Sequence, residues 1–234
     1  MAHPSPTVAG NLSEIRARIE RAASRAKRDP GGVTLVAVTK SVSAERVREA
    51  YEAGVRDFGE NRIQEWEEKK PLLDDLAARW HLVGHLQRNK AALAVNLFHT
   101  VDSLDTLPLA EKLDRAAGEG RRLPVLIEVR LDQAPAKSGC APDELERLAE
   151  GILLMPRLEL RGLMTVPPNS VIISEIRPIF RRLRQLRDDL SKKLDWPLVE
   201  LSMGMSRDLE VAVEEGATQV RVGTALFGPR STAR

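Results

Sequence analysis

The sequence predicts a closed (β/α)8 barrel, the TIM-barrel architecture, preceded by one additional helix. Eight short apolar runs alternate with helical patterns along the 234 residues, and this alternation is typical of parallel strands covered by helices. The runs are spread evenly as far as residue 228, so no segment remains for a second domain. An open, doubly wound sheet is the alternative, because one sequence does not reveal the order of the strands.

The chain is expected to begin with a polar, poorly ordered tail. Residues 1–11 form this predicted tail, and residues 12–234 form the predicted single domain. From residue 12 to residue 28, Leu12, Ile15 and Ile19 recur at helical spacing. This pattern indicates an amphipathic helix before the first strand.

Strands and helices then follow in alternation. The predicted strands cover residues 33–39, 55–58, 80–83, 97–101, 123–129, 159–164, 198–201 and 218–222. The predicted helices cover residues 43–53, 62–77, 86–94, 104–118, 142–154, 175–194 and 206–215. Gly54 and Gly216 stand where the first and the last of these helices are predicted to end, since glycine commonly follows a helix.

Composition and charge argue against several classes of function. The chain has 36 basic and 34 acidic residues and only 3% aromatic residues, so neither charge nor base stacking favours nucleic acid as a partner. The N-terminus does not resemble a secretion signal, and no apolar run has the length needed to cross a bilayer. The single cysteine, Cys140, suits a reducing compartment and is expected to be a surface or loop thiol. We therefore expect a soluble, cytoplasmic protein.

The first predicted strand ends on a lysine. In the run Val33 to Lys40, the side chains of Val36, Val38 and Lys40 share one face, because strand side chains alternate. A buried lysine must be neutral, paired or covalently used. Taken alone, this stretch favours a lysine that is not buried, with its ammonium group at the strand end reaching solvent.

Two loops near the C-terminus have the composition of a phosphate site. Ser202 to Ser206 follow the seventh predicted strand, and Gly223 and Thr224 follow the eighth. Small residues, hydroxyls and backbone N–H groups at this position in a barrel suit a phosphate dianion. Arg221 is predicted to face the barrel interior, where it engages either a ligand or a buried carboxylate such as Glu200 or Glu128.

Closure of the barrel would place Lys40 beside these phosphate loops. A lysine amine, a phosphate pocket and an inward arginine together suit pyridoxal phosphate (PLP), with the lysine bound to its aldehyde as an imine. Asn61, after the second predicted strand, either reaches the hydroxyl of the PLP ring or caps a turn. His81 and His85 lack a carboxylate at ligand spacing, so no metal site is predicted.

Six ordered blocks carry a resemblance to a known family. The blocks are Val36–Lys40 (VAVTK), Phe58–Asn61 (FGEN), Trp80–Lys90, Arg161–Met164 (RGLM), Leu201–Ser206 (LSMGMS) and Val220–Thr224 (VRVGT). Over residues 12–230 the chain resembles the pyridoxal phosphate homeostasis protein family. The resemblance implies a fold-type III barrel related to the N-terminal domain of alanine racemase. It also implies the imine at Lys40 and a cofactor site lined by Asn61, Ser202, Met203, Ser206, Arg221, Gly223 and Thr224. Residues 132–137 and 169–174 differ from the family pattern.

The same resemblance bears on whether the chain is an enzyme. Alanine racemase uses a tyrosine from a second domain as its second acid-base group, whereas Tyr51 here lies on a predicted helix that points away from the rim. An arginine near the ring nitrogen also keeps that nitrogen unprotonated and weakens the ring as an electron sink. We expect a monomeric PLP carrier or buffer without catalytic residues, with PLP-dependent client enzymes as candidate partners.

Two other classes of function stay open at this point. One is a racemase or decarboxylase that uses Lys40 with His85 or Cys140 as the second group. The other is a barrel enzyme that binds a different phosphorylated metabolite.

Overall fold

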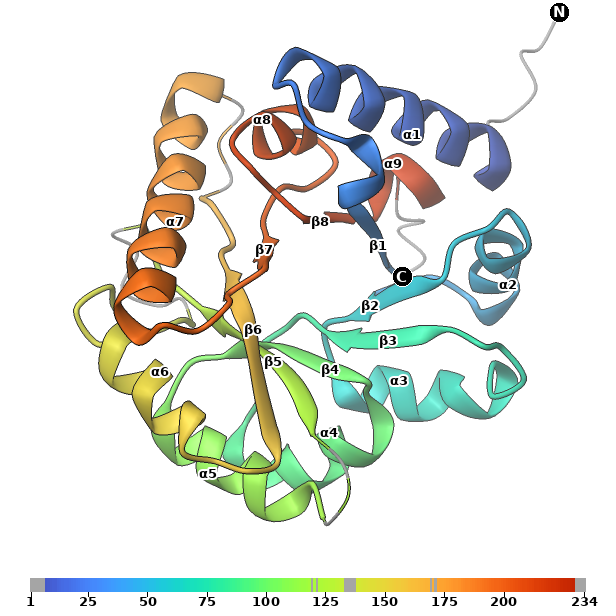
Figure 1. Cartoon of the computed structure of the whole chain (residues 1–234). Coiled ribbons are helices and arrows are strands. Elements are labelled where there is room, and N and C mark those ends of the chain that lie inside the picture. The colour runs from blue at the N-terminus through green and yellow to red at the C-terminus, as the bar shows by residue number, and fades with distance from the viewer. Residues whose placement is uncertain are drawn as a thin grey trace, which may run out of the picture.

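The computed structural model of the chain is a closed parallel barrel in which each strand pairs with the next and β8 pairs with β1 (Figure 1). It describes residues 7–118, 120, 122–132, 138–168, 170 and 172–229. The predicted barrel is therefore confirmed, and the open doubly wound sheet is excluded. Of the predicted tail, residues 1–6 lie outside the described residues.

The elements alternate along the whole chain. The strands are β1 (Thr34–Val38), β2 (Asp57–Glu60), β3 (Arg79–Leu82), β4 (Thr100–Leu104), β5 (Leu123–Glu128), β6 (Leu158–Met164), β7 (Glu200–Ser202) and β8 (Gln219–Val222). The helices are α1 (Val8–Arg25), α2 (Ala44–Glu52), α3 (Ile63–Lys69), α4 (Ala91–Leu97), α5 (Leu107–Ala116), α6 (Leu145–Leu153), α7 (Ile173–Leu194), α8 (Leu209–Glu214) and α9 (Thr224–Phe227), with single 3-10 turns at Pro30–Gly32, Lys70–Leu72 and Arg88–Lys90.

Helix α1 begins four residues earlier than predicted. The Thr7 hydroxyl accepts the N–H of Gly10 at 3.1 Å and so caps the helix. Val8 is only 2% exposed and belongs to the hydrophobic core. The apolar face of this helix therefore continues to Val8, four residues before the predicted start of the domain at residue 12. Figure 1 shows α1 lying beside α8 and α9.

Strand β4 is shifted by three residues from its predicted position at 97–101. The backbone remains helical up to Leu97, and the N–H of Phe98 still bonds to Ala94 O at 2.9 Å. At its other end the strand includes Asp102 and Ser103, which are fully buried and polar. A run of apolar residues in a sequence does not show where a buried helix ends and the next strand begins. A pattern based on apolar residues also fails to include strand residues that are polar.

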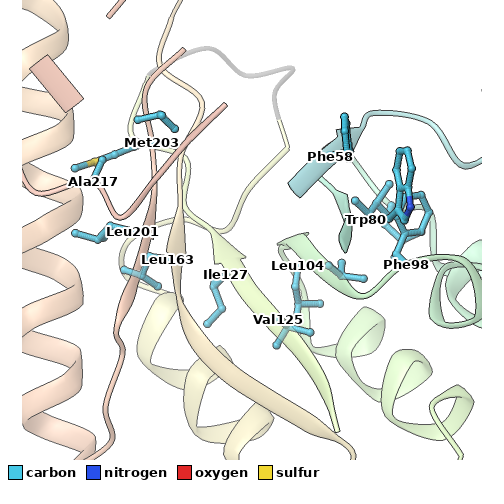
Figure 2. Packing of buried hydrophobic residues seen from close by; sticks show 14 of the residues in the cluster. Phe58, Trp80, Phe98, Leu104, Val125, Ile127, Leu163, Leu201, Met203 and Ala217 are labelled. Atoms are coloured by element: carbon cyan, nitrogen blue, oxygen red, sulfur yellow. The ribbon is translucent and has the colours of Figure 1, made fainter. Parts of the chain in front are cut away.

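The hydrophobic core fills the space between the strands and the surrounding helices (Figure 2). An aromatic group lies on one side, where the ring of Trp80 stacks on Phe58 at 5.1 Å and on Trp66 at 3.7 Å between centroids. Burying each such side chain contributes roughly 1.5–3 kcal/mol to folding. No helix among the described residues has the length and apolar character required to cross a membrane.

Candidate functional site

A cavity of about 420 Å³ opens where the carboxyl ends of the strands meet the loops after β7 and β8. The site of a (β/α)8 barrel is expected at this end. Six of the eight predicted site residues line it: Lys40, Asn61, Ser206, Arg221, Gly223 and Thr224. The structure thus brings together residues as far apart in the sequence as Lys40 and Thr224.

Lys40 is half-buried and follows β1 in a turn. Val38 and Lys40 both line the cavity, as expected for side chains on the same face of a strand. The next residue, Ser41, has φ 58°, which is uncommon for a residue other than glycine. The backbone around Lys40 is therefore held in one specific conformation.

Asn61 follows β2, and its backbone lies against the loop after β3. A Cβ added to Gly84 would lie 2.2 Å from Asn61 O, so only glycine permits this close approach. The side-chain oxygen Oδ1 of Asn61 is buried and has no hydrogen-bond partner among the described residues. A buried polar atom of this kind is costly to leave unpaired, so Asn61 is suited to accept a hydrogen bond from a ligand.

Arg221 lies inside the barrel, as predicted, and is 4% exposed. Its guanidinium donates to Ser202 Oγ and to Thr165 O, each at 2.7 Å. Arg221 does not form the alternative ion pair with Glu200. The carboxylate of Glu200 instead accepts hydrogen bonds from Arg161 and from Gln219, each at 2.6 Å.

Burial has a large effect on the electrostatics of Arg221. It lowers the pKa of the guanidinium, while the carboxylates of Asp102, Glu128 and Asp208 act in the opposite direction. Because arginine does not lose its proton in proteins, the structure holds a buried cation next to the cavity.

Ser202 and Met203, which the resemblance assigns to the cofactor site, are not among the residues that line the cavity. Met203 is fully buried in the hydrophobic core, and its N–H bonds to Gln219 O at 3.1 Å. Ser202 is also fully buried, and its hydroxyl accepts from Arg221. They belong to the same resemblance block as Ser206, but Ser202 is the last residue of β7 and Met203 directly follows it.

The loop after β7 is fixed by several contacts. Gly204 has φ 94°, and a Cβ there would lie 2.4 Å from Ala212 Cβ, so glycine is required. The hydroxyl of Ser206 accepts the N–H of Ala225 at 3.2 Å and thereby links the loops after β7 and β8. Arg18 of α1 donates to Ser206 O at 3.0 Å. The N-terminal helix therefore supports this loop directly.

The sequence did not indicate several lining residues. Asp208 lines the cavity, accepts the N–H of Met205, and has its pKa raised by burial. The apolar part of the lining includes Val38, Val42, Val83, Val166 and Phe227. Apart from Val38, which shares a face with Lys40, these apolar residues look like ordinary core residues in a sequence.

A second cavity of about 780 Å³ lies beside the first and shares Asn61, Val83 and Val166 with it. His85 lines this second cavity, where its Nδ1 is 3.5 Å from Asp105, and its side chain is 54% exposed. His85 is not among the residues that line the cavity of Lys40.

Cys140, the other candidate for a second acid-base group, and Tyr51 are not among the residues that line the cavity of Lys40. Cys140 is 3% exposed rather than on the surface, and burial raises the pKa of its thiol to about 12. An activated thiol requires the opposite shift. Tyr51 lies in α2, where the guanidinium of Arg56 covers its ring at 4.1 Å, and it lines neither cavity.

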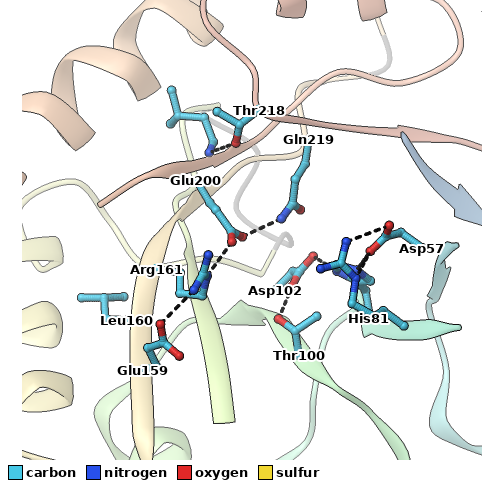
Figure 3. Close-up of polar contacts among 12 residues, drawn as sticks. Asp57, His81, Thr100, Asp102, Glu159, Leu160, Arg161, Glu200, Thr218 and Gln219 are labelled. Carbon is cyan, nitrogen blue, oxygen red and sulfur yellow. Dashed lines mark hydrogen bonds and ion pairs between the residues drawn. The ribbon is translucent and has the colours of Figure 1, made fainter. Parts of the chain in front are cut away.

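A layer of polar side chains lies near the amino-terminal ends of the strands (Figure 3). His81 lies between Asp102 and Asp57, with each ring nitrogen 3.1 Å from a carboxylate oxygen. Burial lowers the pKa of His81, but these two carboxylates outweigh it and raise the pKa to about 9. Within the part of the chain that the structure describes, no group of three or more histidine, cysteine or acidic residues could hold a metal ion.

Comparison with known proteins places the chain in the class of barrels formed by the N-terminal domain of alanine racemase. The profile of the alanine racemase N-terminal domain matches residues 10–231. The closed barrel and its rim cavity agree with this class of barrel. Alanine racemase of Clostridium difficile 630 has the same fold, with a TM-score of 0.76 at 14% identity, over 97% of this chain and 58% of that chain.

Two more similar proteins narrow the class to a family. The pyridoxal phosphate homeostasis protein of Pseudomonas aeruginosa is 46% identical over 225 residues, 96% of each chain. The structure of PipY of Synechococcus elongatus PCC7942 with PLP bound has a TM-score of 0.80 at 42% identity and covers 90% of this chain and 100% of that chain. The chain belongs to the pyridoxal phosphate homeostasis protein family.

Proposed function

We propose that this protein binds PLP in the cavity of about 420 Å³, holds it through an imine to Lys40, and thereby maintains the intracellular supply of the cofactor. The observation that carries the proposal is the convergence of Lys40, Arg221 and the two phosphate loops on one cavity. The PLP bound to the related PipY supports the same ligand.

The residues present fit PLP. The cavity lies within the roughly 300–1,000 Å³ typical of small-molecule sites. Its apolar lining suits an aromatic ring. The unpaired Oδ1 of Asn61 can accept a hydrogen bond that the ring hydroxyl donates. The loops with Ser206, Gly223 and Thr224 suit the phosphate, since hydroxyls and backbone N–H groups bind anions there.

Each residue has a separate task in this proposal. PLP, when bound, supplies an aldehyde that condenses with an amine, and Lys40 supplies that amine. Arg221 presents a permanent positive charge to the ring nitrogen and so keeps a proton off it. Ser202 acts through Arg221, whose guanidinium it binds, and Met203 packs beneath the loop.

We assign the role of carrier rather than enzyme. Amino-acid chemistry on PLP needs a second acid-base group opposite the lysine. Tyr51, His85 and Cys140 do not line the cavity of Lys40, and Asp208, which does, already accepts the N–H of Met205. An unprotonated ring nitrogen further weakens the cofactor as an electron sink. The relatives' name, homeostasis protein, supports this role.

Borohydride reduction tests the attachment site. We expect reduction of the PLP-loaded protein to fix the cofactor on Lys40, detected by mass spectrometry of peptides. Lys40→Ala should remove the imine spectrum and leave weak, phosphate-dependent binding. Lys70→Ala is the matched control, because Lys70 pairs with Asp74 and is not among the residues lining the cavity. An imine spectrum that persists in Lys40→Ala would refute the assignment.

Proton exchange tests the absence of enzymatic chemistry. The loaded protein is incubated with single L-amino acids in deuterated water, and loss of the α-proton is followed by NMR. We expect exchange far below enzymatic rates. Fast exchange would establish a racemase-like activity instead and overturn the carrier role.

The cytoplasmic location, the monomeric state and the PLP-dependent client enzymes are further parts of this proposal. The first is supported by a single, buried cysteine. The monomer can be checked by light scattering, and delivery can be checked by activation of a PLP-free enzyme mixed with the loaded protein.

A further inference from the structure

The turn that carries Lys40 is held by side chains from β2 and α3. Strand β1 ends at Val38, so the sheet does not fix the backbone of Lys40 itself. The neighbouring residue Ser41 has φ 58°, a conformation that persists only where the surroundings enforce it. The contacts that enforce it are therefore important for the direction of the Lys40 amine.

The backbone is held on both sides of Lys40. On one side, Lys69 Nζ donates to Thr39 O at 2.6 Å. On the other side, the N–H of Ser41 donates to Glu65 Oε1. Lys40 thus lies between two backbone groups that are each bound by a side chain of α3.

These side chains form one ion network, which we name the α3 clamp: Lys69, Glu65 and Glu60. Lys69 Nζ lies 2.8 Å from Glu60 Oε1 and 2.9 Å from Glu65 Oε1. Glu60 is fully buried and accepts the hydroxyl of Thr39 at 2.7 Å. Lys69 is 12% exposed at its side chain. One ammonium group therefore connects both backbone contacts and neutralises a carboxylate that has no access to water.

We propose that the α3 clamp positions Lys40, so that Lys69, Glu65 and Glu60 determine how readily its amine forms the covalent link to PLP. None of the three side chains lines the cavity, so they act through the backbone of Thr39 and Ser41 rather than by touching the cofactor. The inference rests on the proposed function, because it concerns the link at Lys40.

Substitutions at Glu65 separate positioning from folding. Glu65 is 25% exposed at its side chain and lies in a helix, so alanine is tolerated there. Glu65→Ala removes the acceptor for the Ser41 N–H, whereas Glu65→Gln keeps an oxygen in place. We expect Glu65→Ala to weaken the covalent link about tenfold and Glu65→Gln to restore most of it.

Three measurements on each full-length variant give the answer. The imine absorbance as a function of pH reports the link, and the affinity for pyridoxine 5′-phosphate, which has no aldehyde, reports binding without the link. Thermal unfolding reports stability. In Glu65→Ala the covalent link should weaken, the affinity for pyridoxine 5′-phosphate should stay the same, and the melting temperature should change only slightly. Equal covalent linkage in Glu65→Ala and wild type would overturn the proposal, as would an equal loss of affinity for pyridoxine phosphate.

Lys69→Met extends the test to the centre of the clamp, with Lys70→Met as the matched neighbour. We expect weaker linkage for Lys69→Met and wild-type behaviour for Lys70→Met. If Lys69→Met does not fold because Glu60 is left unpaired, the double variant Lys69→Met, Glu60→Gln removes both charges and is measured instead. Normal linkage in the folded variant contradicts the inference.

The two proposals fail differently. If borohydride fixes no cofactor on Lys40 of the wild type, the proposed function is wrong. If the wild type is labelled on Lys40 and the clamp variants are labelled equally, only the positioning role is wrong.

Discussion

Single residues at the rim show how close packing positions the proposed site. A Cβ on Gly84 would lie 2.2 Å from Asn61 O and 2.7 Å from Asn61 Cα, both backbone atoms. The backbone at Asn61 must shift to make room for it. This couples a small residue after β3 to the side chain that we propose to contact the PLP ring.

We predict that Gly84→Ala destabilises the protein by about 1–3 kcal/mol, as overpacking usually does, and also weakens PLP binding. Urea unfolding and a PLP titration measure the two effects. Gly32→Ala is the control, since a Cβ there meets no atom within 4 Å. Unchanged stability in Gly84→Ala would mean that the Asn61 loop moves freely.

His81 makes stability depend on pH. Its pKa is raised from 6.5 to about 9 in the folded chain by Asp102 and Asp57, which outweigh the effect of burial. Because the folded pKa is the higher one, the stabilisation is fully present below pH 6.5 and is lost as the pH rises through about 9. Its size is on the order of 3 kcal/mol.

We therefore predict that the free energy of unfolding of the wild type decreases between pH 6.5 and pH 9. His81→Gln should be less stable at pH 6.5 and should show little of this decrease. The control is His85→Gln, because that side chain is 54% exposed. A wild-type profile that is flat over this range would show that the two carboxylates do not stabilise the protonated imidazole.

At the scale of elements, the sequence predicted those strands whose apolar runs end at turn residues. Pro30, Gly31 and Gly32 precede β1 and set its start. The predicted position of strand β4 was wrong because two of its residues, Asp102 and Ser103, are polar. Their hydrogen-bond partners, His81 and Gly84 O, come from β3 and the loop after it. Such partners become visible only when the strands are assembled.

Helix α1 illustrates how an element outside the barrel supports the site. Arg18 binds Glu210 of α8 at 2.6 Å and Ser206 O at 3.0 Å. Both side chains are partly exposed, so this pair contributes about 1 kcal/mol or less to stability. Its main effect is to hold the loop after β7 against the helix.

We predict that Arg18→Met weakens PLP binding about threefold to tenfold, a loss of roughly 1 kcal/mol, with a small decrease in melting temperature. The matched control is Arg21→Met on the same helix, because Arg21 binds Glu14 and is 57% exposed. Equal affinities of the two variants for PLP would show that the Ser206 loop does not depend on α1.

At the scale of the whole molecule, the proposed site depends on barrel closure. Val36 pairs with Arg221 and Ala37 with Val222 where β1 meets β8, so Lys40 and the loop after β8 adjoin although they lie far apart in the sequence. The sequence could predict candidate residues such as Lys40, Arg221 and Thr224 because their charged or hydroxyl groups suit the binding of a phosphorylated ligand. It could not predict that Met203 would point into the core, since the depth of a residue along β7 follows from the register of the assembled sheet.

A ligand that binds across this closure should stabilise the entire fold. PLP bridges residues from both ends of the chain in the proposed site, and an unfolded chain offers no such arrangement. At 100 times the dissociation constant, linkage adds about 2.7 kcal/mol, or roughly 5–10 °C in melting temperature for a chain of this length. We therefore predict that the melting temperature increases with PLP concentration.

Lys40→Ala should show a smaller increase at equal PLP concentration, because the covalent part of the affinity is absent. Pyridoxal without its phosphate should raise the melting temperature less than PLP in both proteins. Differential scanning fluorimetry over a range of ligand concentrations measures all three effects. A melting temperature that does not respond to PLP in the wild type would show that the ligand does not bind across the β8–β1 closure.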